Sequence, residues 1–180
     1  NKTVTKLAAL MAATLLLLTG CAQSPNTAAI VGNQTITMAS VDAFAHQLET
    51  AVASVSQGTG QETPTWGALR SSALQVMVQI EIVKAANLDA KVTVTDAQRK
   101  SAASSNAIYG ALAKDPSAAG VLSEWLDAIV VANDTKGSAA LTKAAAATPV
   151  TVNPVFGTWD AAQLKLSGDS GSLSKSIASS

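Results

Sequence analysis

Hydrophobic positions follow two different periods along residues 28–160. In residues 28–37 (AAIVGNQTIT) the apolar Ile30, Val31 and Ile36 surround the turn pair Gly32-Asn33, which predicts a short hairpin-like β segment. After residue 37 the apolar positions recur every three or four residues, as on one face of a helix. The first helical stripe precedes a polar linker at residues 57–61, has Thr37 or Ser40 as its cap, and comprises Val41, Phe44, Leu48, Val52 and Val55.

A second and longer helix is predicted from Trp66, because Pro64 just before it suits a first helical turn. The sequence allows this helix to end at Asn87 or to continue through Leu88 to Ala90. Its apolar stripe, which Met77 widens, comprises Leu69, Ala73, Val76, Ile80 and Val83.

Two further helices are predicted in the middle of the chain. Val92-Thr93-Val94 is too short for an independent strand, whereas Thr95 with Gln98 three residues later fits a capping box. We therefore expect a third helix from Thr95 to about Tyr109. The dipeptide Asp115-Pro116 then breaks the chain before the fourth helix. The fourth helix is expected to bury Val121, Leu122, Trp125, Leu126, Ile129 and Val130.

The C-terminal third is less regular. Residues 134–148 are rich in alanine and fit either a helix or a mobile arm. Residues 149–154 (PVTVNP) alternate β-branched positions between prolines, which predicts an edge strand that could pair with residues 28–37. Residues 161–180 are predicted to be a flexible tail, serine- and glycine-rich from residue 167. The expected fold class is mainly α with a small β element.

The first twenty residues have the pattern of a signal peptide. Lys2 and Lys6 precede an apolar stretch at residues 7–18, which as a helix would span about 18 Å against the ~30 Å of a bilayer core, so a transmembrane helix is the weaker interpretation. Residues 18–21 (LTGC) resemble the lipobox of bacterial lipoproteins. The resemblance implies cleavage before Cys21, a diacylglycerol on its thiol, and a location on the outer face of the bacterial cytoplasmic membrane. The alternative is an ordinary secretory signal with an unrelated cysteine.

In the lipoprotein interpretation residues 1–20 are the signal peptide, 21–27 a short tether and 28–160 a single domain. The full chain of 180 residues has 12 basic and 12 acidic side chains. Removal of residues 1–20 takes away Lys2 and Lys6 and leaves a net charge of −2. Neither a basic nucleic-acid binder nor an acidic disordered chain is indicated.

Candidate catalytic and metal-binding groups are few. Cys21 is the only cysteine and His46 the only histidine, which excludes a disulfide framework and a zinc site built on cysteines or paired histidines. Residues 168–171 (GDSG) repeat the letters around a trypsin-like nucleophile, but the oriented histidine base is missing, since His46 reads as a solvated residue of the first helix. Glu124 and Asp127 share a helix face, but without a partner on another element they indicate no site. We expect no enzyme, cofactor or metal.

The tryptophans divide by their surroundings. Trp125 lies on an apolar stripe and is expected in the core. Trp66, beside a prolyl turn, is the candidate for lining a surface groove, with plain packing as the simpler alternative.

Three short segments, in order, carry a family resemblance. Residues 29–37 followed by Val41-Asp42 resemble the opening of SurA-type and PrsA-type chaperone domains, and residues 92–96 (VTVTD) resemble the start of a later helix in them. Residues 152–160 (VNPVFGTWD) resemble the Val-Asn-Pro-Arg-Phe-Gly-Thr-Trp ending of bacterial lipoproteins with a SurA-like N-terminal domain, with Val155 in place of the usual arginine. The resemblance spans residues 28–160 and implies a SurA N-terminal-like helical domain closed by a short strand pair.

The resemblance also implies a function. Only about twenty residues separate Val130 from Val150, too few for a parvulin domain, so prolyl isomerase activity is not expected. We expect a lipid-anchored chaperone or holdase for unfolded exported polypeptides, with Trp66 and Met77 as candidate polypeptide-binding residues. The alternative is a structural or envelope-interaction lipoprotein that binds one dedicated partner.

Overall fold

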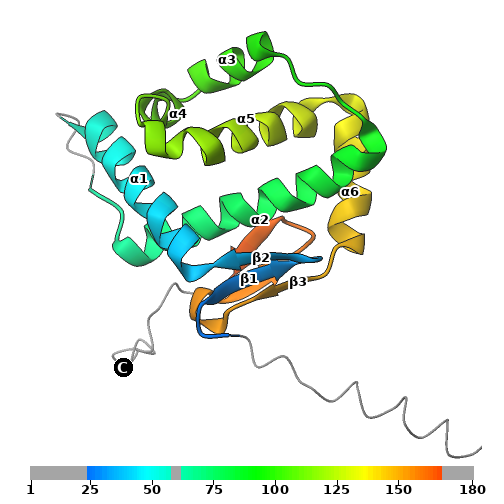
Figure 1. The fold of residues 1–180 in the computed structure, drawn as a ribbon, viewed down its shortest axis with the longest axis horizontal. Helices are drawn as coiled ribbons and strands as arrows, with labels where there is room; N and C mark the ends of the chain where they lie inside the picture. The colour runs from blue at the N-terminus through cyan, green and yellow to red at the C-terminus, as the bar shows by residue number, and fades with distance from the viewer. Residues whose placement is uncertain (1–23, 58–61, 168–180) are drawn as a thin grey trace, which may run out of the picture.

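The computed structural model describes residues 24–57 and 62–167 (Figure 1). The predicted signal peptide with Cys21, the glycine positions of the linker, and residues 168–180 of the predicted tail, with the GDSG letters, lie outside these residues. The elements, with η for a 3₁₀ turn, are β1 (Thr27–Val31), β2 (Gln34–Thr37), α1 (Met38–Ser56), α2 (Trp66–Ala90), α3 (Asp96–Ser104), α4 (Ala107–Leu112), η2 (Pro116–Ala118), α5 (Ala119–Asn133), α6 (Thr135–Ala147), β3 (Val150–Val152), η3 (Pro154–Phe156), β4 (Thr158–Asp160) and β5 (Lys165–Ser167). The mainly α fold with a small β element is confirmed.

A three-stranded antiparallel sheet joins the start and the end of the domain. Its order is β2-β1-β3, so β3 is the predicted edge strand, and Ile30 lies opposite both Thr35 and Thr151. Gly32 turns the β1–β2 hairpin with φ +57°, a conformation that favours glycine. Thr27, predicted as the last residue of the tether, is instead the first residue of β1.

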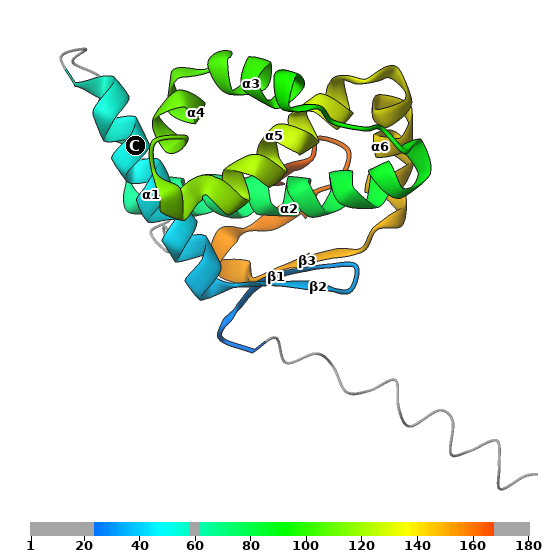
Figure 2. The same ribbon diagram turned by 45° about the horizontal axis from the view of Figure 1, so that its top comes forward.

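Helix α2 is the centre of the molecule. Figures 1 and 2 show it running between the sheet on one side and α5 on the other, with α1 and α6 packed near its two ends. The predicted stripe of α2 is therefore too narrow, because the helix has buried positions on several sides. Its buried residues are Leu69, Ala73, Leu74, Val78, Ile80, Ile82, Val83 and Ala86.

The ends of the first two helices follow from their caps. The Thr37 hydroxyl accepts from the Ser40 N–H at 3.1 Å, so of the two predicted caps of α1, Thr37 and Ser40, the structure has Thr37. In α2 the cap is Thr65, so Pro64 precedes the cap rather than lying in the first turn, which corrects its predicted place. The helix continues to Ala90 and stops at Lys91, which has φ +53°.

The predicted third helix is two helices. The capping box of Thr95 and Gln98 is confirmed at the start of α3. However, α3 ends at Ser104, and a new helix begins where the Asn106 side chain accepts from the Ile108 N–H at 2.8 Å. The predicted continuation to Tyr109 is wrong because Asn106 takes an extended conformation as the cap of α4.

Helices α5 and α6 form a pair near the end of the fold. The buried residues of α5 are Leu122, Leu126, Ala128 and Val131, whereas Val121, Trp125, Ile129 and Val130 are only partly buried, so the predicted stripe was placed off centre. The alternatives for residues 134–148 resolve to a helix, capped by the Asp134 side chain.

Residues 161–167 belong to the fold, which corrects the predicted start of the tail. Strands β4 and β5 pair, with Trp159 opposite Leu166. Two glutamines of α2 hold this hairpin, because Gln79 donates to the Leu164 carbonyl at 2.7 Å and Gln75 accepts from the Leu166 N–H at 3.1 Å. These long-range contacts are absent from any local sequence pattern.

Candidate functional site

The two candidate polypeptide-binding residues lie apart on α2. Trp66 opens the helix with 38% of its surface exposed. Met77 is half-buried against the main core, eleven residues or about 17 Å further along the axis. Neither residue lines any of five well-defined hollows on the described surface. The structure thus does not bring them together in one groove.

Trp66 instead contacts the only histidine. Its ring lies 4.4 Å from the His46 ring of α1, with the planes tilted by 34°. The His46 side chain is 68% exposed and its Nδ1 is 3.3 Å from a carboxylate oxygen of Glu49. The prediction of a solvated helix residue is confirmed, and the contact indicates that Trp66 packs across the start of α2 onto α1.

A mostly apolar hollow lies on one side of the contact between α1 and α4. Its volume is about 370 Å³. We call it the α1–α4 hollow; its lining residues are Val52, Val55, Ser56, Glu62, Pro64 and Ile108. The three aliphatic side chains are each partly buried, so they present apolar surface to the hollow while resting on the fold. Its size is at the small end of the range for ligand sites and suits one or two apolar side chains.

A second hollow, of about 410 Å³, lies on the other side of the same contact. Its lining residues on α1 lie about 140° around the helix from those of the first hollow; they are Gln47, Thr50, Ala51 and Ser54. Lys114 and Asp115 contribute charged side chains to its rim, although most of its lining surface is apolar, as in the first hollow. Gln47 donates to the Ser117 hydroxyl at 3.2 Å, which connects α1 to η2.

Asp115 organises the turn beside that hollow. The Ser117 hydroxyl donates to its carboxylate at 2.7 Å and the Ser117 N–H at 2.9 Å. These bonds hold the pKa of Asp115 below its ordinary value of 3.8. The carboxylate therefore acts as the cap of η2, in line with the predicted chain break at Asp115-Pro116.

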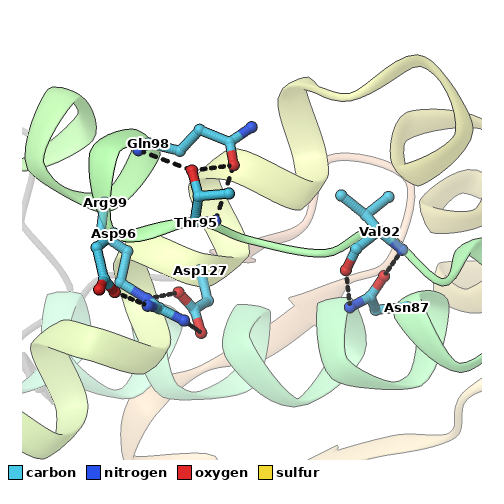
Figure 3. A network of polar contacts seen from close by, with 7 residues as sticks. All are labelled: Asn87, Val92, Thr95, Asp96, Gln98, Arg99 and Asp127. Atoms are coloured by element: carbon cyan, nitrogen blue, oxygen red, sulfur yellow. Dashed lines mark hydrogen bonds and ion pairs between the residues drawn. The ribbon is translucent and has the colours of Figure 1, made fainter.

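The carboxylates of α5 are partners of cations on other helices, which corrects their interpretation as unpartnered charges. Arg99 of α3 donates to both carboxylate oxygens of Asp127 and also to Asp96 (Figure 3). The hydrogen bonds that Arg99 donates to Asp127 outweigh the cost of burial and raise the pKa of Arg99. Asp127 thus holds α3 against α5.

Lys84 forms the corresponding link between α2 and α5. Its ammonium lies 2.9 Å from Glu81 and 3.1 Å from Glu124. Burial lowers the pKa of Lys84, but the hydrogen bonds and charges of the two glutamates outweigh burial and raise it above 10.5. Lys84, Glu124 and Asp127 line a small hollow of about 130 Å³ together with aliphatic side chains. The ion pairs therefore stabilise the packing of α2 and α3 against α5.

The loop between α2 and α3 is closed by one side chain. The Asn87 amide accepts from the Val92 N–H at 2.8 Å and donates to the Val92 carbonyl at 3.1 Å (Figure 3). Trp125 packs nearby against the second core cluster of Ile80, Val83, Ala128 and Val131, which confirms its predicted packing role. This end of the molecule is built for packing, and Asn87 carried no sequence signal beyond its place near a helix end.

Within residues 24–57 and 62–167, no group of three or more histidine, cysteine, aspartate or glutamate side chains could hold a metal ion. In the same residues no helix has the length and apolar character needed to cross a bilayer. Comparisons with protein-family models, curated proteins and solved structures found no match to this chain.

Proposed function

We propose that this chain is an exported protein, lipid-anchored at Cys21, that binds extended apolar segments of unfolded exported polypeptides and keeps them from aggregating. The signal-like residues 1–20 and the lipobox-like residues 18–21 support export and anchoring. The ordered resemblance to SurA-type domains supports a polypeptide ligand. Client binding in this proposal involves no covalent step.

The observation that carries the binding function is the α1–α4 hollow. Four of its six lining residues, Val52, Val55, Pro64 and Ile108, are apolar, and Glu62 is the only charged one. Burial of one aliphatic side chain there is worth about 1.5–3 kcal/mol before the cost of ordering the ligand. A gain of this size corresponds by itself to a dissociation constant weaker than about 1 mM, so in this proposal the hollow binds a client together with further contacts along the extended segment.

A charge placed in the hollow tests this assignment. Ile108→Glu should weaken binding of a labelled, apolar, extended peptide at least about tenfold, equivalent to about 1.4 kcal/mol. Ala107→Glu is the matched control, because it adds the same charge to the neighbouring, exposed position of α4. Fluorescence anisotropy gives both affinities, and circular dichroism verifies that each variant folds. Equal weakening by both variants, or no binding by the unaltered chain, would count against the hollow as the site.

A second candidate function is favoured by one feature of the surface. In the described residues the exposed large hydrophobic side chains are Trp66 at the start of α2, Leu88 near its end and Val155 in η3, so Leu88 lies far from Trp66 along the helix. General chaperones commonly present contiguous apolar patches, whereas scattered apolar residues are normal for other proteins. An envelope lipoprotein that binds one dedicated partner would fit this surface, and failure to bind any of several unrelated peptides would favour it.

A further inference from the structure

The position where the chain enters the fold is fixed by hydrogen bonds at one end of the domain. The Thr27 N–H donates to the Ser24 carbonyl, and the Met38 N–H donates to the Asn26 carbonyl, both at 2.8 Å. From the other end of the sequence, the Asn153 amide donates to the Thr27 carbonyl at 3.0 Å. We call this region, residues 24–27 with the start of α1 and η3, the anchor end.

The anchor end is tied to Cys21 by a very short connection. Cys21 is three residues before Ser24, so the chain between them spans at most about 10 Å. A lipid on Cys21 that is embedded in a bilayer therefore keeps Ser24 within about 10 Å of the cysteine. The domain is free to pivot, but this end cannot move away from the membrane surface.

An exposed aliphatic side chain lies close to the start of β1. Val155 belongs to η3, directly after the Asn153 that binds Thr27, and is 49% exposed. Its neighbour Phe156 is buried, with the Arg70 guanidinium 5.1 Å from its ring centre. Buried Phe156 thus holds η3 on the fold while Val155 faces outward.

The charged network lies toward the other end of α2. The ion pairs of Lys84 with Glu124, Arg99 with Asp127, and Lys143 with Asp89 involve the second half of α2 and the helices around it. Arg70, paired with Asp42, marks the first part of α2. Leu88 is 18 residues after Arg70, about 27 Å along the axis. Figures 1 and 2 both place the start of β1 and the end of α2 at opposite ends of the sheet.

From these observations we propose that the anchor end faces the bilayer and that Val155 enters the lipid headgroup region. The inference rests on the proposed lipid anchor at Cys21. The occupant of this surface is the lipid bilayer itself, because the three-residue connection brings it there and the apolar side chain gains from leaving water. The domain then presents the far end of α2 to the aqueous side.

Nitroxide labels on two matched variants test the orientation. Val155→Cys and Leu88→Cys replace exposed aliphatic residues on opposite ends of the domain, and lipid on Cys21 leaves each introduced cysteine as the only free thiol. The lipidated chain is placed in vesicles of phosphatidylethanolamine and phosphatidylglycerol. We expect a label at residue 155 to collide several-fold less often with a water-soluble nickel complex, and more often with oxygen, than a label at residue 88.

Two outcomes would contradict the inference in different ways. If the chain carries lipid and binds the vesicles but both labels meet the nickel complex equally, the orientation is wrong and the anchor stands. If the chain carries no lipid on Cys21 and does not bind the vesicles, the proposed anchor fails and the orientation fails with it. Mass spectrometry of the N-terminal peptide distinguishes the two cases.

Discussion

Gly137 of α6 lies so close to Val131 of α5 that a Cβ on residue 137 would be 1.9 Å from the Val131 carbonyl oxygen. No side chain fits at that distance, so the turn between the two helices requires glycine at this position. The close approach brings α6 onto the end of α5 and directs the chain back toward β3, which pairs with β1. The closure of the domain therefore depends on this contact.

Gly137→Ala should destabilise the fold by about 1–3 kcal/mol, because backbone must shift to admit the methyl group. Gly110→Ala is the matched control, since Gly110 lies within α4 and a Cβ there meets nothing within 4 Å. The control should gain about 0.5–1 kcal/mol from helix propensity. Urea denaturation measures the change in the free energy of unfolding for both variants. A Gly137→Ala variant as stable as the original protein would refute the close contact.

Asn153 should be needed for the junction between the two ends of the sequence. Its amide donates to the Thr27 carbonyl and its oxygen accepts from the Val155 N–H at 3.1 Å. Asn153→Ala loses both bonds and should cost about 1–2 kcal/mol. Asn153→Asp keeps the acceptor and loses the donor, so it should fall between. Thermal unfolding ranks the three proteins, and an alanine variant as stable as the original would contradict this role.

The glutamines of α2 should hold the C-terminal hairpin. Gln79→Ala removes the bond to the Leu164 carbonyl, and the backbone amides of residues 165–167 should then exchange hydrogen about fivefold faster, equivalent to about 1 kcal/mol of local stability. Gln163→Ala is the control, because it removes an exposed glutamine from the turn between the same strands. Unchanged exchange in the Gln79 variant would show that the strands pair without α2.

Asp115 should make the stability depend on acid pH. Because its folded-state pKa lies below 3.8, its contribution is present above that value and is lost as the pH falls through the folded pKa. Asp115→Asn keeps a cap oxygen but does not titrate, so it isolates the charge. Between about pH 5 and pH 2 the original protein should lose stability relative to the Asn variant. Denaturation at several pH values checks this, and parallel pH profiles would contradict it.

Local signals in the sequence predicted local features of the fold. The Gly32-Asn33 turn, the Thr37 cap and the box of Thr95 with Gln98 each involve residues within a few positions, and all three are confirmed. The break between α3 and α4 also had a local signal in Asn106, a favourable cap. Contacts between distant residues had no such signal. The partners of Asp127 and Gln79 are 28 and 85 residues away.

The candidate site shows the same division. Val52 and Val55 were placed on a helical stripe, which predicts only that they meet other apolar groups. The hollow they share with Ile108 exists because α4 is a separate short helix that packs on α1, and the single third helix expected from the sequence would have placed Ile108 elsewhere. Trp66 is a candidate because of its place beside a prolyl turn and Met77 because of its adaptable side chain, and their roles in polypeptide binding stay a prediction.

Suppression of aggregation is the most direct test of the proposed holdase. An unfolded exported protein is diluted from denaturant with and without a stoichiometric amount of residues 22–180, and light scattering is followed. We predict clear suppression by the unaltered protein and by Ala107→Glu, and a reduced effect with Ile108→Glu. Scattering that is unchanged across several unrelated client proteins would contradict the holdase function and favour a lipoprotein with one dedicated partner.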